Sequence, residues 1–174
     1  ALRFVPLRLL LALLALLGAL ALPASAADSE TPRVLAVTLE NDVNPVTADY
    51  VNGQIDRAND EGYDAVVILL DTPGGLAEAM RDIVKKQLDS AVPVIVYVSP
   101  DGARAASAGV WIGQAADILA MAPQTNIGSS TPVAVGGADI PKDLKRKVVN
   151  DAVSSLTALA KEHGRNTEWP AEAV

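Results

Sequence analysis

Short apolar runs alternate along the chain with segments in which apolar residues recur at helical spacing. The apolar runs, each of strand length, cover residues 34–39, 65–70, 92–98 and 118–122. The second run, AVVILL, has no polar position, which is typical of a strand buried on both faces of a parallel sheet. The helical spacing predicts helices over residues 48–59, 76–88, 106–116 and 143–163. Strands that alternate with helices predict an α/β domain with a mainly parallel sheet and flanking helices.

The first helix has a candidate cap, and the N-terminal 26 residues resemble an export signal. Thr47 stands where an N-cap residue would precede the helical pattern. At the N-terminus, Arg3 and Arg8 precede an apolar run over residues 9–22, and small residues follow at 24–26. This order predicts a secretory signal peptide, residues 1–26, that is cleaved after its last residue. A retained anchor would need about 20 apolar residues, which is longer than this run.

Composition narrows the class of protein. A chain of 174 residues that is 50% hydrophobic can bury one core, so we expect a single exported domain over residues 27–174. A helical pattern still runs over residues 169–174, so we expect this domain to be truncated at its C-terminus. There is no cysteine, which excludes disulfides and thiolate chemistry. The net charge of -7 argues against a nucleic-acid partner. One histidine and scattered carboxylates offer no metal-ligand spacing, so we expect neither a metal nor a cofactor.

A serine at a loop-to-helix transition is the candidate nucleophile. Ser107 lies in the small-residue segment AASAG, after a predicted strand and at the start of a predicted helix. The first N–H groups of a helix are unpaired and its dipole favours negative charge, so an oxyanion would be stabilised there. Taken alone, the segment is more typical of close helix packing than of catalysis.

Two glycines at the end of the buried second strand change that balance. Gly74 and Gly75 free the backbone to present N–H groups inward, and with the N–H of Ala108 they would form an oxyanion hole. In parallel sheets, active sites gather at the carboxyl ends of neighbouring strands. A plain strand-to-helix turn is the simpler reading of DTPGG alone, and only the two loops together favour an active site.

The general base is harder to assign from the pattern. His163, the only histidine, precedes Gly164 in a helix C-terminal pattern, which favours a structural role. In the absence of a histidine base, a lysine whose pKa is lowered by burial is the natural partner of a catalytic serine. Among Lys142, Lys145 and Lys147, the helical spacing favours Lys145, which lies nearest the apolar stripe of the last helix.

Four segments together carry a family resemblance. They are LLDTPGGL (69–76), VYVSPDGARAASAG (96–109), APQTNIGSSTPV (122–133), and KVVNDAV with HGRN (147–153 and 163–166). From about residue 34 to residue 174 the chain resembles the NfeD-type membrane-bound serine proteases of the ClpP class. Each segment alone is unspecific, and the combination is specific.

The resemblance implies a ClpP/crotonase-like fold and a Ser-Lys dyad. It implies that Ser107 is the nucleophile, that Lys147 rather than Lys145 is the base, and that Gly74 or Gly75 with the Ala108 N–H holds the oxyanion. It also implies cleavage of hydrophobic segments of membrane-associated proteins, with stomatin-like proteins as partners and substrates. Location on the extracytoplasmic side of the membrane is expected from the export signal, and tethering is expected from C-terminal segments outside this sequence.

Two other functions stay open at this point. A crotonase-type acyl-CoA enzyme would use the same fold and oxyanion hole without needing a serine nucleophile. A non-catalytic scaffold would bind membrane partners in the same cleft and form no acyl-enzyme. One departure from the family is the polar stretch at residues 40–42, where small and apolar residues are expected. The sequence leaves the oligomeric state open, with a homodimer among the options.

Overall fold

The computed structural model describes residues 31–134 and 141–174. The predicted signal peptide, residues 1–26, lies outside the described residues. Pro32–Val174 forms one compact unit, which contains the whole of the candidate site. Within its described part, no helix combines the length and apolar character needed to cross a bilayer.

A four-stranded sheet forms the centre of this unit. Its strands are β1 (Val34–Leu39), β2 (Ala65–Leu70), β3 (Val94–Val98) and β5 (Ile118–Met121), in the order β1-β2-β3-β5. All three pairings are parallel. The parallel α/β arrangement and the four predicted strands are therefore confirmed, with β3 and β5 shorter than expected by two residues and one residue.

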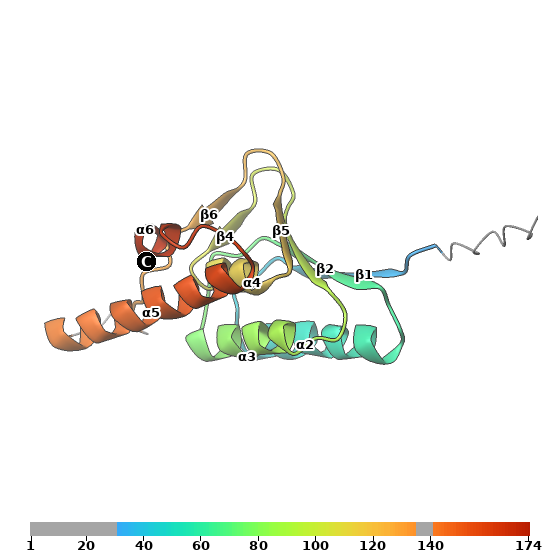
Figure 1. The fold of residues 1–174 in the computed structure, drawn as a ribbon, viewed down its shortest axis with the longest axis horizontal. Helices are drawn as coiled ribbons and strands as arrows, with labels where there is room; N and C mark the ends of the chain where they lie inside the picture. Colours follow the sequence, from blue (N-terminus) through green and yellow to red (C-terminus); the bar gives the residue numbers. More distant parts are fainter. Residues whose placement is uncertain (1–30, 135–140) are drawn as a thin grey trace, which may run out of the picture. The chain divides into compact units, whose positions relative to one another are not determined.

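Helices connect strands of the main sheet, and further helices follow the last strand. They are α2 (Pro45–Asp60), α3 (Ala77–Leu88), α4 (Ala108–Ala115), α5 (Lys142–Glu162) and α6 (Trp169–Ala173). Figure 1 shows α2 and α3 side by side beneath the sheet, and α4 then contacts α3, while α5 contacts α4 and α6. Every predicted helix is present, with ends that differ from the prediction by at most three residues.

The cap of α2 is a correction to the prediction. The helix begins at Pro45, and Asn44 rather than Thr47 is its N-cap residue. The Asn44 side chain accepts the N–H of Val46 at 3.0 Å and of Thr47 at 3.1 Å, while Thr47 Oγ1 accepts the Asn44 N–H at 2.9 Å. Proline is favoured in the first turn, where its missing N–H would have had no partner. Thr47 therefore occupies the third position of a capping box.

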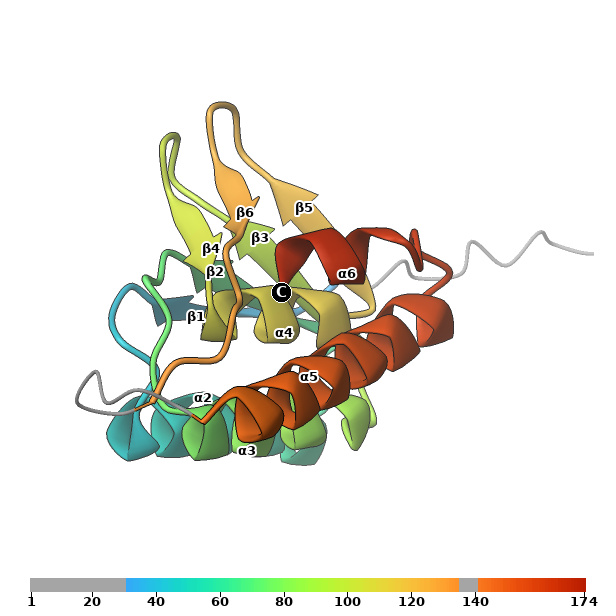
Figure 2. The same ribbon diagram turned by 90° about the vertical axis from the view of Figure 1, so that its left-hand side faces the viewer.

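A second, smaller sheet was not predicted. It pairs β4 (Arg104–Ala106) with β6 (Asn126–Gly128) in parallel. Figure 2 shows the two loops that lead into these strands rising together beside β5. Isolated bridges extend the layer, because Thr72 pairs with Ala105 and Val43 pairs with Gly75. This layer places the loop after β2 directly against the loop that carries the candidate serine.

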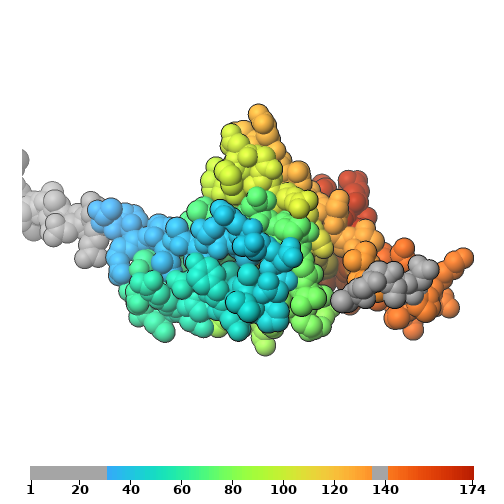
Figure 3. Space-filling view, turned by 180° about the vertical axis from the view of Figure 1, so that it is seen from behind, coloured from blue at the N-terminus to red at the C-terminus, as the bar shows by residue number. Residues whose placement is uncertain are grey.

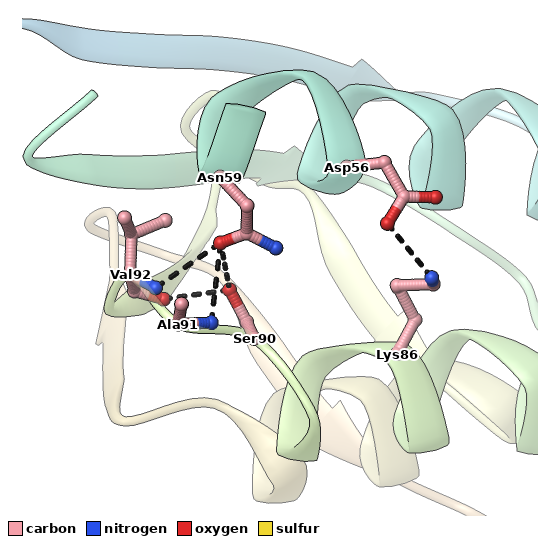
Figure 4. Close-up of polar contacts among 6 residues, drawn as sticks. All are labelled: Asp56, Asn59, Lys86, Ser90, Ala91 and Val92. Atoms are coloured by element: carbon pink, nitrogen blue, oxygen red, sulfur yellow. Dashed lines mark hydrogen bonds and ion pairs between the residues drawn. The ribbon is translucent and has the colours of Figure 1, made fainter. Parts of the chain in front are cut away.

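The face of the unit that lies behind in Figure 1 is covered by β1 and α2. Figure 3 shows the atoms of β1 and α2, in blue and cyan, over much of this face. Asn59, near the end of α2, holds the turn that leads into β3, as Figure 4 shows. Its Oδ1 accepts hydrogen bonds from Ser90 Oγ at 3.2 Å, Ala91 N at 3.1 Å and Val92 N at 3.2 Å. These hydrogen bonds thus fix the turn before β3, the strand that leads to the candidate site.

Candidate active site

Ser107 adopts a backbone conformation that is rare for a residue with a side chain. It is the N-cap residue of α4, with φ 50° and ψ -114°. Such strained conformations cost about 1 to 3 kcal/mol and persist only where the surroundings hold them. Here the Ser107 N–H donates to the carbonyl of Gly128 at 3.3 Å, and the Ser107 carbonyl accepts the N–H of Val110 at 3.0 Å. The fold thus holds a half-buried serine in a costly geometry at the start of a helix.

The loop after β2 lies against this serine. A Cβ on Gly74 would lie 2.5 Å from Ser107 Cβ, and the φ of Gly74 is 114°. The Gly74 N–H is already engaged, because it donates to Thr72 Oγ1 at 3.1 Å. The Gly74 carbonyl accepts the N–H of Val43 at 2.7 Å. Of the two glycines predicted as oxyanion donors, Gly74 therefore has its N–H committed elsewhere.

Gly75 is pressed against main-chain atoms on its other side. A Cβ on Gly75 would overlap the Val43 carbonyl oxygen, so only glycine fits. Within residues 31–134 and 141–174, the N–H groups of Gly75 and of Ala108 donate no hydrogen bond to the protein. Two donors, one in the loop after β2 and one directly after the loop that follows β4, are thus available to a ligand.

These donors and the serine line one cavity of about 530 Å³. Its walls come from the whole length of α3, from α4, from residues 130–134 and from α5. Gly75, Ser107 and Ala108 all line it. The apolar part of the wall includes Leu76, Met80, Val84, Leu88, Trp111 and Leu159. The cavity therefore joins the candidate nucleophile and two free N–H groups to an apolar surface suited to non-polar side chains.

The predicted lysine base is not part of this cavity wall. Lys147 is exposed, as are Lys142 and Lys145, while Val148 and Asp151 do line the cavity. The buried residues of α5 begin only at residue 152, and Figure 1 shows the first turns of the helix extending past α4. The structure thus brings Ser107, the glycine loop and Ala108 together and leaves Lys147 exposed, outside the cavity lining.

The HGRN segment has a structural role around α4 and α5. His163 is the C-cap residue of α5, and Gly164 comes next with φ 65°, in agreement with the predicted helix end. Sequence reasoning missed Arg165, whose guanidinium donates to the carbonyls of Gln114 at 2.7 Å and Ala116 at 2.6 Å. An arginine after a glycine helix stop was the available signal. The residue holds the C-terminus of the helix that carries Ser107.

In the part of the chain that the structure describes, no group of three or more histidine, cysteine, aspartate or glutamate side chains is arranged to hold a metal ion.

Comparison with known proteins gives a consistent family. A family profile described as "NfeD1b, N-terminal domain" matches residues 33–174. The membrane-bound protease PH1510 of Pyrococcus horikoshii is 36% identical over 144 residues, which are 81% of this chain and 32% of that protein. The membrane protein NfeD1b of Bacillus subtilis is 33% identical over 107 residues, 62% of this chain and 24% of that protein. The chain thus spans about a third or less of these relatives.

Solved structures agree with this assignment. A serine-to-alanine mutant of 1510-N, a membrane-bound stomatin-specific protease, matches with a TM-score of 0.75 at 34% identity, over 83% of this chain and 70% of that one. ClpP1 of Listeria monocytogenes, at 20% identity, matches with a TM-score of 0.62 over 79% of this chain and 77% of that one, which shows a shared ClpP-like fold. The chain belongs to the NfeD family, as a ClpP-like domain that corresponds to the family's N-terminal part.

Proposed function

We propose that this domain is a serine endopeptidase with Ser107 as its nucleophile. The observation that carries the proposal is the strained Ser107 at a helix N-terminus, in one cavity with the unbonded N–H groups of Gly75 and Ala108. A helix N-terminus and two convergent donors stabilise the negative charge that develops on a carbonyl oxygen under attack. The relatives are longer than this chain, so the proposed activity is that of the whole protein to which this domain belongs.

We propose Lys147 as the base on the strength of the relatives. The 1510-N protease was crystallised as a serine-to-alanine mutant and, with a substrate peptide, as a lysine-to-alanine mutant. The two mutated residues stand 41 positions apart in that chain, against 40 between Ser107 and Lys147 and 38 between Ser107 and Lys145. The match favours Lys147. Because Lys147 is exposed, we propose that the first turns of α5 move toward Ser107 when substrate fills the cavity.

The proposed reaction is acyl transfer in two steps. The amine of Lys147 accepts the proton of Ser107 Oγ as that oxygen bonds to the peptide carbonyl carbon. The carbonyl electron pair moves onto the oxygen, which the N–H groups of Gly75 and Ala108 bind. The C–N bond then breaks and the Lys147 ammonium protonates the leaving amine. Water repeats the sequence on the ester, which releases a carboxylic acid and restores Ser107.

The apolar cavity wall supports a hydrophobic substrate segment. Leu76, Met80 and Trp111 present non-polar surface in the cavity that Ser107 lines. The related 1510-N protease is named as specific for a stomatin homologue. We therefore propose hydrophobic segments of stomatin-like membrane proteins as substrates, cleaved on the extracytoplasmic side of the membrane. The predicted export signal and the membrane-bound relatives support that location.

Intact-mass spectrometry with a serine-directed fluorophosphonate tests the proposal. One adduct is expected on the wild-type protein, none on Ser107→Ala, and a rate lower by about 100-fold or more on Lys147→Ala. Ser155→Ala is the matched control, since Ser155 lines the same cavity and its loss should leave labelling unchanged. Lys145→Ala, another exposed lysine nearby on α5, should also label normally.

Other outcomes identify the alternatives. If the wild-type protein binds hydrophobic peptides but forms no adduct and releases no cleavage product, the domain is a scaffold. If Ser107→Ala retains thioester turnover, the oxyanion hole serves an acyl-CoA reaction instead. Either result would overturn the endopeptidase assignment.

A further inference from the structure

The side chain of Thr72 is buried between the two loops of the candidate site. Its exposed fraction is 0%. The Thr72 hydroxyl donates to the Asn41 carbonyl at 2.8 Å, and its oxygen accepts the Gly74 N–H at 3.1 Å. The Gly74 carbonyl oxygen lies 3.3 Å from the same hydroxyl. One buried hydroxyl thus binds the N–H of Gly74 and contacts its carbonyl oxygen.

The main chain of Thr72 holds the serine loop as well. Its N–H donates to the Arg104 carbonyl at 2.8 Å, and its carbonyl accepts the Ala106 N–H at 3.1 Å. These two bonds form the bridge between Thr72 and Ala105, two residues before Ser107. The Asp71 side chain adds a bond to the Arg104 N–H at 3.0 Å. Thr72 is therefore the residue at which the glycine loop and the nucleophile loop meet.

The orientation of the Gly75 N–H results from these contacts. In a planar trans peptide, the carbonyl of one residue and the N–H of the next point in opposite directions. The Gly74 carbonyl is held by the Val43 N–H at 2.7 Å and lies beside the Thr72 hydroxyl. The Gly75 N–H must then point away from Val43 and Thr72, and Gly75 lines the cavity. A flip of the Gly74–Gly75 peptide would remove this donor from the cavity.

We propose that Thr72 is a positioning residue that holds this peptide in the orientation that exposes the Gly75 N–H to an oxyanion. The inference rests on the proposed peptidase function and extends it to a residue that does not touch substrate. Preorganised donors are effective because they need no reorganisation during the reaction. The hydroxyl is the group of Thr72 that holds the peptide in place, since it makes the contacts with Gly74.

The methyl group of Thr72 has a separable role in packing. Thr72 Cγ2 lies 2.7 Å from where a Cβ on Gly109 would be, so it fills the space against α4. Thr72→Val keeps a group of that size and removes the hydroxyl. Thr72→Ser keeps the hydroxyl and removes the methyl. The two substitutions therefore separate positioning from packing.

The test compares fluorophosphonate labelling rates and peptide turnover in these variants. We expect Thr72→Val to lower the labelling rate and kcat by about 10- to 100-fold with KM within about twofold, a fraction of the loss of a whole oxyanion donor. Thr72→Ser should stay within about threefold of wild type in both rates, although its unfolding midpoint falls. Thr125→Val is the control, because it also removes a hydroxyl bonded to a carbonyl, that of Ala122 at 2.6 Å, in the loop between β5 and β6.

Each result decides the inference. Equal labelling of Thr72→Val and wild type overturns it and leaves the peptidase function standing. Absence of labelling in wild type overturns both. If Thr72→Val does not fold, Thr72→Ser is compared with Thr72→Ala, which lacks both groups. Equal rates in that pair contradict the inference, and a rate at least about tenfold higher with serine supports it.

Discussion

Gly74 contacts Ser107 so closely that a Cβ on Gly74 would lie 2.5 Å from Ser107 Cβ and 3.0 Å from Ser107 Oγ. The loop after β2 and the loop before α4 therefore meet without space for one more methyl group. Because Ser107 is itself in a strained conformation, it has little freedom to move aside. The rotamer of the candidate nucleophile is thus controlled by the absence of a side chain on a neighbouring loop.

Gly74→Ala is expected to displace Ser107 and to reduce peptidase activity and fluorophosphonate labelling by about 100-fold, as small misplacements of reacting groups do. The substitution also places alanine at φ 114°, which destabilises the fold. Gly102→Ala is the control, since Gly102 has φ 81° with open space around it and tests backbone strain alone. Urea unfolding and labelling rates are measured for both. Normal labelling of Gly74→Ala would show that Ser107 tolerates the added methyl group.

Gly75→Ala is expected to destabilise the domain more than Gly74→Ala does. The new Cβ would overlap the Val43 carbonyl oxygen and lie 2.5 Å from the Val43 nitrogen, and main chain cannot rotate away. The bridge between Val43 and Gly75 would have to open. We expect a loss of about 3 kcal/mol in the free energy of unfolding, measured in urea, at the upper end of overpacking costs. A loss below about 0.5 kcal/mol would mean that the bridge is not held in solution.

The limits of the sequence pattern can be traced to particular residues. The strands β1 and β2 were predicted to the residue because short, dense apolar runs with clear breaks at both ends leave little alternative. The strands β4 and β6 have three residues each, too few to show a period of two. Their existence depends on the pairing of residues 104–106 with residues 126–128, which no local pattern encodes.

In the candidate site, too, some residues were predicted from the sequence and other assignments needed the structure. Ser107, Gly75 and Ala108 were predicted from loops next to buried strands, and the sheet brings such loops together by its geometry. The choice between Gly74 and Gly75 needed the hydrogen bond from Gly74 to Thr72, which pattern alone does not show. The role of Lys147 depends on where the first turns of α5 lie, and the buried residues of this helix begin only at residue 152.

Arg165→Met is expected to lower the free energy of unfolding by about 2 kcal/mol, because hydrogen bonds to charged groups contribute about 1.5 to 3 kcal/mol. The lost bonds are those to the Gln114 and Ala116 carbonyls at the end of α4. Burial lowers the pKa of the Arg165 guanidinium from its ordinary value, and the charge of Asp117 opposes that shift. The control is Arg146→Met, which removes an exposed arginine 3.5 Å from Asp143 and should cost under about 0.5 kcal/mol. Equal midpoints in urea for the two variants would contradict the role of Arg165.

The last prediction concerns movement of α5 toward Ser107. Lys147 is exposed while Val148 and Asp151 line the cavity, so a peptide in the cavity contacts the helix next to the proposed base. The chain has no cysteine, and Lys147→Cys therefore gives a single thiol whose reaction with a maleimide reports its accessibility. We expect a hydrophobic peptide to slow that reaction by about tenfold through burial of the thiol. Lys142→Cys, at the exposed start of α5, should react at the same rate with and without peptide. If peptide binds and the rate at position 147 does not change, α5 does not close on the cavity and Lys147 is not the base.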